Sequence, residues 1–169
     1  AVPAPLGSDL VRVSTIARDL AEDLPGRNAA IGHPVSDRVV DATTSMAAEL
    51  SRIEADVLVD HDLHGENVLR GEREPWLAID PKVAVGVPEF AVGPLLWTRF
   101  DELVNGPTSD LRRNLAWALD LLVEAAHLDR EVARAWAVVE CVDYWAWGLA
   151  AGFTQDPIRC RAIVEQLLF

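Results

Sequence analysis

The sequence predicts one mainly helical α+β domain formed by residues 1–169. Apolar residues recur at helical spacing in both halves of the chain, and short β-type runs are confined to residues 57–79. Half of the residues are hydrophobic, and this share is sufficient to build a substantial core. A chain of this length usually forms a single domain, so we expect one unit.

Two helices are expected before the β-type runs. In the first, apolar side chains from Leu10 to Leu24 repeat at helical spacing, and Pro25-Gly26 is expected to end the helix. The second is expected over residues 36–53, with a continuous apolar face. The Pro-rich residues 1–7 should be extended, because proline fixes φ and has no backbone N–H to donate to a helix.

Three short strands should follow, at residues 57–59, 68–69 and 76–79. Each is a run of Val, Leu, Ile or Trp, and polar or Gly/Pro-rich loops separate the runs, which is typical of hairpins in a small sheet. The loops between such strands are the usual place for functional side chains.

Four helices should complete the domain. Three are expected over residues 89–104, 109–126 and 130–151, and the last should begin with Asp156 as its cap and Pro157 as its first residue. We expect most of the six tryptophans to be core anchors on these helices. The two cysteines lie in apolar helical surroundings, which indicates reduced core thiols.

The net charge of −12 excludes several classes of partner. Nucleic acids and anionic membranes bind proteins through Lys and Arg, so neither is expected here. No apolar run reaches the roughly 18 residues that a membrane span needs, and a cytoplasmic protein is expected. An acidic surface concentrates cations, which favours a cationic partner, although net acidity can also serve solubility alone.

The segment from Asp60 to Asn67 is unusually polar for a link between two apolar strands. Asp62 and Asn67 are separated by four residues, and Asp80 follows at the end of a later strand, which is the spacing used in phosphoryl transfer. Carboxylate and amide oxygens suit Mg²⁺, and a further carboxylate must accept the proton of the acceptor hydroxyl. The pattern therefore predicts a magnesium site at Asn67 and Asp80 and a general base at Asp62.

The stretch Val59 to Lys82 is similar to the catalytic core of aminoglycoside and hydroxyurea phosphotransferases, in particular the streptomycin 6-kinase branch. The similarity is strongest over residues 57–100 and extends more weakly to both ends. It implies the C-terminal lobe of a protein-kinase-like fold that transfers phosphate from ATP, with Mg²⁺, to a hydroxyl of a small cationic or polar antibiotic. It assigns catalysis to Asp62 and metal binding to Asn67 and Asp80. It also assigns the histidine that follows the catalytic aspartate to His64, and we expect His64, Lys82 and Asp60 to support the site.

The chain also departs from this family's usual pattern. Asp60 stands where the family's first loop histidine is usual, and His61 where a glycine is usual. The sequence contains no G-x-G, and Lys82 cannot be the phosphate-binding lysine of a nucleotide lobe. We therefore expect the N-terminal nucleotide-binding lobe to be absent from these 169 residues, and the chain to be inactive alone. An uncovered apolar face should then favour self-association or pairing.

A candidate substrate-binding face lies in the long helix near the C-terminus. Glu140, Asp143 and Trp147 share one side of that helix, and an acidic and aromatic surface suits a cationic substrate. The same three residues would equally fit a solvated helix edge with one buried tryptophan.

Two other functions are compatible with the sequence. A metal-dependent phosphohydrolase could use the His61-Asp62 dipeptide with His33 and Asp80, although such dipeptides normally lie on a helix. The loop histidines with Asp62 and Glu66 could instead bind zinc, without the usual helical motif. The second of these functions is that of a non-catalytic lobe that binds a ligand or a partner.

Overall fold

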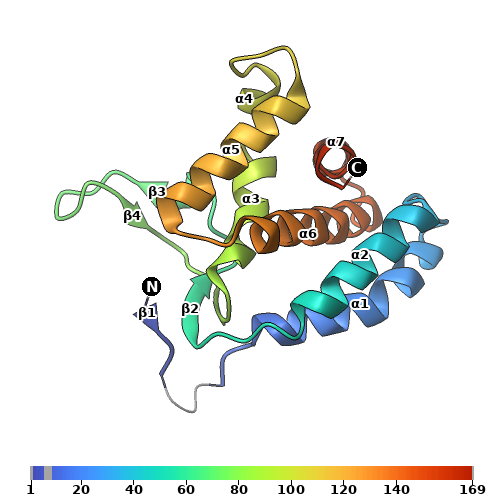
Figure 1. Ribbon diagram of the computed structural model, residues 1–169, viewed down its shortest axis with the longest axis horizontal. Helices are drawn as coiled ribbons and strands as arrows, with labels where there is room; N and C mark the ends of the chain where they lie inside the picture. The colour runs from blue at the N-terminus through green and yellow to red at the C-terminus, as the bar shows by residue number, and fades with distance from the viewer. Residues whose placement is uncertain (1, 6–8, 169) are drawn as a thin grey trace.

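The computed structural model describes residues 2–5 and 9–168, and these form a mainly helical α+β structure, as predicted, with two small sheets (Figure 1). The elements in chain order are β1 (Val2–Pro3), α1 (Val13–Ala30), α2 (Asp37–Leu50), β2 (Val57–Asp60), η1 (Gly65–Asn67), β3 (Val68–Leu69), β4 (Leu77–Ala78), β5 (Val83–Val85), η2 (Pro88–Ala91), α3 (Val92–Trp97), α4 (Phe100–Val104), α5 (Leu111–Ala126), α6 (Arg130–Ala150) and α7 (Gln155–Leu167).

Helix α6 is the centre of the structure. It packs against α1, α2, α3, α5 and α7, and in Figure 1 it runs through the middle of the fold. Its residues Trp136 and Val139 are almost completely buried, as are Leu24 of α1, Leu115 of α5 and Ile163 of α7. One continuous hydrophobic core therefore joins both halves of the chain.

The two sheets differ from the single hairpin-like insert that the sequence suggested. The larger sheet has the order β1-β2-β5 and is antiparallel, with Leu58 opposite Val85 and Asp60 opposite Val83. Strands β3 and β4 form a separate two-stranded hairpin that projects from the body of the domain (Figure 1). The short run 83–85 was not predicted as a strand, yet it brings residues 80–82 beside the end of β2.

Helix α1 continues past Pro25 and Gly26 to Ala30, so the predicted helix stop is wrong. Pro25 lies on the exposed side of the helix, where water can replace the backbone hydrogen bond that proline removes. Beyond it, Asn28 is 1% exposed and exchanges two hydrogen bonds with the backbone of Val35, of 2.8 and 3.1 Å. Tertiary packing of the last turn therefore outweighs the local helix-breaking signal.

The predicted helix over residues 89–104 is divided into η2, α3 and α4. The chain turns at Thr98-Arg99, where the Thr98 hydroxyl donates to the carbonyl of Pro94 at 2.6 Å. The predicted cap of the last helix is also displaced: α7 begins at Gln155, so Asp156 lies within its first turn instead of capping it. Its carboxylate is thereby free to face α6.

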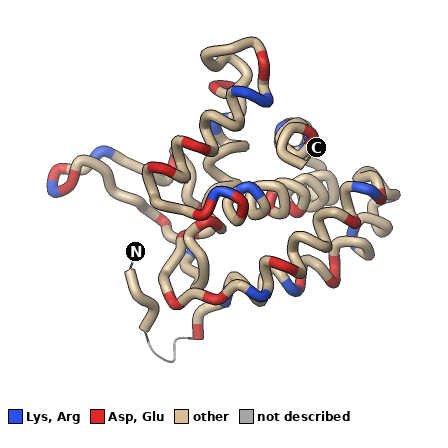
Figure 2. The backbone as a smooth tube through the Cα atoms, viewed as in Figure 1, with Lys and Arg blue, Asp and Glu red and all other residues tan. Residues whose placement is uncertain are grey.

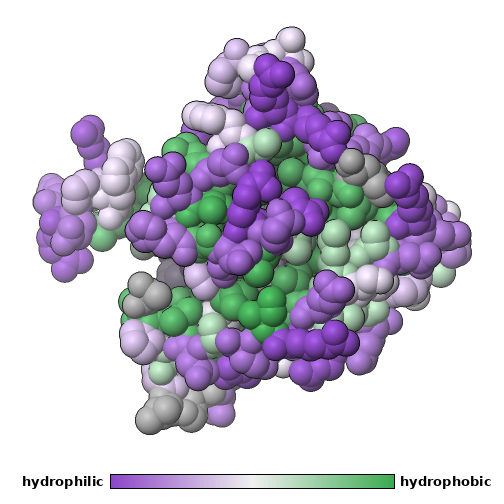
Figure 3. All heavy atoms as spheres, viewed as in Figure 1, coloured by the Kyte–Doolittle hydropathy of each residue, from purple (hydrophilic) through white to green (hydrophobic). Residues whose placement is uncertain are grey.

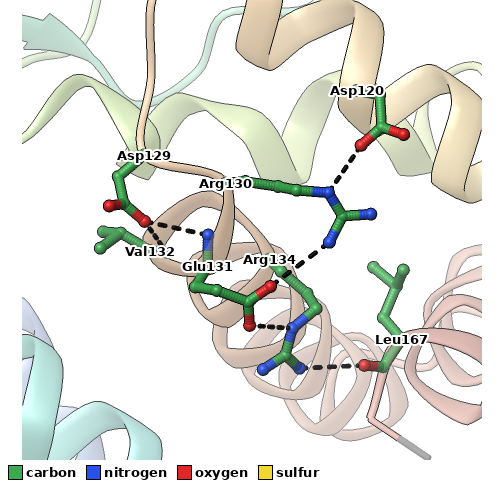
Figure 4. A network of polar contacts seen from close by, with 7 residues as sticks. All are labelled: Asp120, Asp129, Arg130, Glu131, Val132, Arg134 and Leu167. Atoms are coloured by element: carbon green, nitrogen blue, oxygen red, sulfur yellow. Dashed lines mark hydrogen bonds and ion pairs between the residues drawn. The ribbon is translucent and has the colours of Figure 1, made fainter.

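The start of α6 is fixed by a polar network (Figure 4). The Asp129 carboxylate caps the helix by accepting from the backbone N–H groups of Glu131 and Val132 at 2.9 and 3.0 Å. Arg130 pairs with Asp120 of α5 at 2.7 Å, and Arg134 donates to the backbone carbonyl of Leu167 at 3.0 Å. The network joins α5, α6 and the end of α7.

The expectation that most tryptophans are core anchors is wrong, whereas the prediction for the cysteines is confirmed. Only Trp136 and Trp145 are buried; Trp97 is partly buried, and the other three are exposed, by 66% at residue 76, 55% at residue 117 and 46% at residue 147. Cys141 and Cys160 are buried free thiols. Tryptophan is therefore available at the surface of this domain for contacts other than packing.

The surface is acidic and contains an apolar region. Acidic side chains are distributed over most of the helices (Figure 2), and hydrophobic residues occupy the middle of one face, bordered by hydrophilic ones (Figure 3). Leu69, Trp76 and Ile79, on and beside the β3–β4 hairpin, are each more than 40% exposed. Among the helices of the described residues, none is long and apolar enough to cross a membrane.

Candidate functional site

The polar loop at residues 60–67 leaves the end of β2 and returns through η1 to β3. It is not helical at the His61-Asp62 dipeptide, because Asp60 is still paired with Val83 in the sheet. The loop therefore projects from the edge where β2 and β5 meet, and the segment before β5 lies beside it.

Asp60 connects these two segments. Its Oδ1 atom accepts from the backbone N–H of Asp62 and from that of Lys82, both at 3.1 Å. The backbone N–H of His61 donates to the carbonyl of Lys82 at 3.0 Å. The Oδ2 atom of Asp60 is buried and has no hydrogen-bond partner among residues 2–5 and 9–168. An aspartate here thus fixes the start of the loop through backbone hydrogen bonds.

Asp62 forms an ion pair with Lys82. The Lys82 Nζ and Asp62 Oδ2 atoms are 2.6 Å apart, and the two side chains are 57% and 32% exposed. The hydrogen bond to Asp62, and then the charge of Asp62, raise the pKa of Lys82, with smaller contributions from Asp80 and Asp60. The ammonium group therefore stays charged, and the charges of three carboxylates, Asp62, Asp80 and Asp60, act on it.

Asn67 is held in a defined orientation. Its side-chain Nδ2 atom donates to the backbone carbonyl of Asp62 at 3.1 Å, which places Oδ1 on the opposite side of the amide. Its own carbonyl accepts from Ile79 N–H at 2.8 Å, so β4 and the following Asp80 lie beside it. Asp80 has φ of +47°, a left-handed conformation that Asp tolerates better than most residues.

A cavity of about 670 Å³ opens on the other side of Asp62. Its walls come from the polar loop and from α3, α4, α6 and α7. The lining residues are Asp62, His64, Gly65, Glu66, Pro94, Trp97, Thr98, Arg99, Glu102, Tyr144, Asp156 and Arg159. Asn67 and Asp80 are not among them, so of the three residues predicted for catalysis and metal binding only Asp62 lines this cavity.

Aromatic rings form one wall of the cavity and continue out of it. Trp97 stacks on Tyr144 with centroids 4.9 Å apart, and Tyr144 stacks on Trp147 at 5.3 Å. The Tyr144 hydroxyl lies 3.4 Å from the Asp156 carboxylate. Burial, and then the charge of Asp156, raise the pKa of Tyr144, so its hydroxyl remains neutral at neutral pH.

The three residues predicted to bind substrate do not line this cavity. Glu140 lies between α3 and α6, where it accepts from the backbone N–H of Gly93 at 3.2 Å, and burial raises its pKa well above the usual range. Asp143 pairs with Arg27 of α1 at 2.6 Å. Trp147 is not a lining residue and stacks on Tyr144, which is one. Tyr144, one helical turn from both Glu140 and Trp147, occupies the position predicted for them.

The two alternative metal centres are not assembled in the structure. Across residues 2–5 and 9–168, no three His, Cys, Asp or Glu side chains are grouped so that they could hold a metal ion. His61 packs against Phe90, with ring centroids 6.0 Å apart, and His33 lies beyond the end of α1 in a left-handed conformation. These positions argue against both the phosphohydrolase centre and the zinc site.

Sequence reasoning missed most of the cavity wall. Most of the six tryptophans were expected in the core, with Trp97 not singled out, and Asp156 was expected to be a helix cap. Arg159, which pairs with Asp101 at 2.7 Å, gave no signal that would place it near the loop. The i, i+3 spacing of Asp156 and Arg159 in one helix is the one pattern that could have suggested a shared polar face.

Comparisons with known proteins agree on one family. The sequence profile of the family described as "Aminoglycoside/hydroxyurea antibiotic resistance kinase" matches residues 1–152. The chain is 36% identical to the streptomycin 6-kinase of Streptomyces griseus over 98% of its own length and 53% of that protein. It is 37% identical to the streptomycin 6-kinase of Streptomyces glaucescens, over 89% of this chain and 48% of the relative. The hydroxyurea phosphotransferase of Kitasatospora aureofaciens is 36% identical over 99% of this chain and 46% of its own.

The chain therefore spans about half the length of the curated relatives it matches. No solved structure matches it significantly.

Proposed function

The chain belongs to the aminoglycoside/hydroxyurea antibiotic resistance kinase family, and on this basis we propose that it is the catalytic lobe of a phosphotransferase. In this proposal residues 2–168 form the C-terminal lobe of a protein-kinase-like fold. The reaction transfers a phosphoryl group from a nucleoside triphosphate to a hydroxyl of a small antibiotic. Asp62 accepts the proton of that hydroxyl as its oxygen bonds to phosphorus and the nucleoside diphosphate leaves.

The position of Asp62 is the observation that supports this proposal most strongly. Its side chain lines the cavity, where an acceptor would bind, and its backbone carbonyl holds the amide of Asn67. A base in a phosphotransferase needs this placement, because it must touch the acceptor and also lie beside the groups that hold the phosphates. Asp60 supports the loop from within by fixing its first turn, and His64 lines the cavity beside Asp62.

The residues present fit a magnesium ion. Asn67 directs its Oδ1 atom away from the bond to Asp62, and Asp80 adds a carboxylate next to β4. Mg²⁺ is commonly held by one or two protein oxygen ligands together with phosphate oxygens and water, so a pair of ligands is sufficient. When bound, the ion would neutralise charge on the phosphates being transferred.

The cavity chemistry supports a cationic or polar acceptor. The lining contains four carboxylates and two arginines, and both arginines are already paired with carboxylates. A planar cation can stack on Trp97 while its charge interacts with Asp156 or Glu66, which line the same cavity. The relatives named for streptomycin and hydroxyurea suggest such compounds as first candidates.

The groups that hold a nucleotide triphosphate are expected to lie outside these residues. The sequence has no G-x-G loop, and its single lysine is paired with Asp62. Positioning provides most of the catalysis in phosphoryl transfer. We therefore expect the 169-residue chain alone to transfer phosphate poorly, and to require ATP together with a nucleotide-binding lobe.

The test is a fusion of this chain to the part of the Streptomyces griseus streptomycin 6-kinase that it does not match. ATP-dependent transfer to streptomycin and to hydroxyurea is measured. Asp62→Asn should lower turnover by about 10²-fold or more, since it removes the general base. Asp110→Asn is the matched control, because Asp110 caps α5 outside the cavity and Asn caps helices equally well.

Two results would contradict the proposal. Full turnover in the Asp62→Asn variant would remove Asp62 from the chemistry. A folded fusion that binds streptomycin, seen as a change in tryptophan fluorescence, but transfers no phosphate to any tested acceptor would argue against a kinase. Because Trp97 lies in the cavity wall, this fluorescence also reports binding to the 169-residue chain alone.

A further inference from the structure

We propose that Lys82 is an internal counter-ion: its ammonium group neutralises Asp62 while the site is empty and leaves Asp62 when a divalent cation binds. This rests on the proposed function above, which places a magnesium ion at Asn67 and Asp80. The role differs from the static support that the sequence suggested for Lys82, because one residue changes partner as the site fills.

The geometry separates a fixed backbone from a movable side chain. The Lys82 N–H donates to Asp60, and the Lys82 carbonyl accepts from His61, so the backbone is held on both sides. The side chain, in contrast, is 57% exposed, and its ammonium group is held by Asp62. A lysine has four rotatable side-chain bonds, so its head group can leave Asp62 without disturbing the loop.

The charges favour such a movement. Asp60, Asp62 and Asp80 all act on the ammonium group, and without a cation the three carboxylates would repel one another. A doubly charged ion at Asp80 replaces this neutralising charge and repels the ammonium group. The movement also has a chemical consequence, because the Oδ2 atom of Asp62 cannot accept a proton from a hydroxyl while Lys82 occupies it at 2.6 Å.

Reciprocity turns this into a binding measurement. If a divalent cation displaces Lys82, then removing the ammonium group must strengthen cation binding. Mn²⁺ serves as the probe, and its affinity for the 169-residue chain is measured by electron paramagnetic resonance at fixed pH. Lys82→Met should bind Mn²⁺ about fivefold more tightly than the wild type, and Lys82→Arg, which keeps the charge, should remain close to the wild type.

Arg161→Met is the matched control, because it removes one positive charge from an exposed pair with Glu165 on α7, away from the loop. It should change Mn²⁺ affinity by less than about twofold. Equal or weaker binding in Lys82→Met, or no measurable binding in either protein, overturns the proposal. Cooperative thermal unfolding of each variant shows that the comparison is between folded proteins.

A direct observation of the side chain completes the test. Lys82 is the only lysine in the sequence, so lysine labelled with ¹⁵N at Nζ gives a single signal. Addition of Mg²⁺ should shift that signal, whereas an unchanged signal at saturating Mg²⁺ contradicts the movement. Asp80→Ala separates the two levels of the proposal. If Asp80→Ala leaves Mn²⁺ binding intact, the proposed magnesium site itself is wrong. If Asp80→Ala abolishes Mn²⁺ binding but Lys82→Met does not tighten Mn²⁺ binding, only the counter-ion role of Lys82 fails.

Discussion

Gly93 is where α3 approaches α6 most closely, and Gly93→Ala tests that packing. A Cβ atom at this position would lie 2.4 Å from the Oε2 atom of Glu140, 3.0 Å from its Cβ atom and 3.0 Å from the ring of Trp97. The first of these distances is shorter than real Cβ contacts allow. The Glu140 carboxyl group must therefore move, and its hydrogen bond with the backbone N–H of residue 93 breaks.

The expected loss of stability is the sum of three effects. Overpacking in a buried helix contact costs about 1–3 kcal/mol. A buried polar group left without its partner costs about 1–3 kcal/mol more. Alanine recovers about 1 kcal/mol, because it is a better helix former than glycine. Gly93→Ala should therefore lower the free energy of unfolding by about 3 kcal/mol.

Urea unfolding measures this value, and two variants make the result specific. Gly26→Ala is the same substitution in α1, where the added Cβ would meet no atom of the described residues within 4 Å beyond its own turn of helix, so it should stabilise by about 0.5–1 kcal/mol. Adding Glu140→Ala to Gly93→Ala removes the clashing group and should recover part of the loss. Gly93→Ala as stable as the wild type, or a double variant without recovery, would refute the reasoning.

Three further predictions concern the charge and the surface of the domain. Glu140→Gln should raise the free energy of unfolding at neutral pH by about 1 kcal/mol or more. Burial raises the pKa of Glu140, so the contribution of this carboxyl group to stability is complete below the usual pKa of 4.5 and is lost as pH rises through the folded-state pKa. Urea unfolding at pH 5 and pH 8 should show a smaller difference in this variant than in the wild type. Asp129→Ala should destabilise by about 1 kcal/mol in thermal or urea unfolding and Asp129→Asn by far less, because only alanine removes the cap of α6. Sedimentation should show association that strengthens from low to moderate salt, since salt screens the net charge of −12 and residues 69–79 expose apolar side chains; a monomer in both buffers would contradict this.

The polar loop was predictable from the sequence because its geometry is local. Asp62 and Asn67 belong to one short connection between strands, and a single hydrogen bond joins them. Asp80 required one more step, the pairing of β3 with β4, which the apolar runs also indicated. When residues lie in one loop or at the ends of paired neighbouring strands, their spacing in the sequence is therefore sufficient to predict that they lie close together.

The cavity wall could not be predicted in the same way. Trp97, Tyr144 and Asp156 meet only because α3, α6 and α7 pack together, and helical spacing within one helix does not state which neighbour a face will meet. The same limit explains α1, where the packing of Asn28 against Val35 carries the helix past Pro25. Local signals describe an element, while tertiary contacts decide where it ends and what it faces.

Most of the cavity wall comes from a later part of the chain than the polar loop, which affects how such a protein can evolve. The lining residues are Asp62, three residues of the range 64–66, and residues between 94 and 159. Asn67, Asp80 and Lys82 lie in the stretch 67–93, which supplies none of the lining residues. Mutations that reshape the wall can therefore accumulate in one half of the gene while the other half stays constant. A lineage with this architecture can change the shape of the cavity while Asn67, Asp80 and Lys82 stay unchanged.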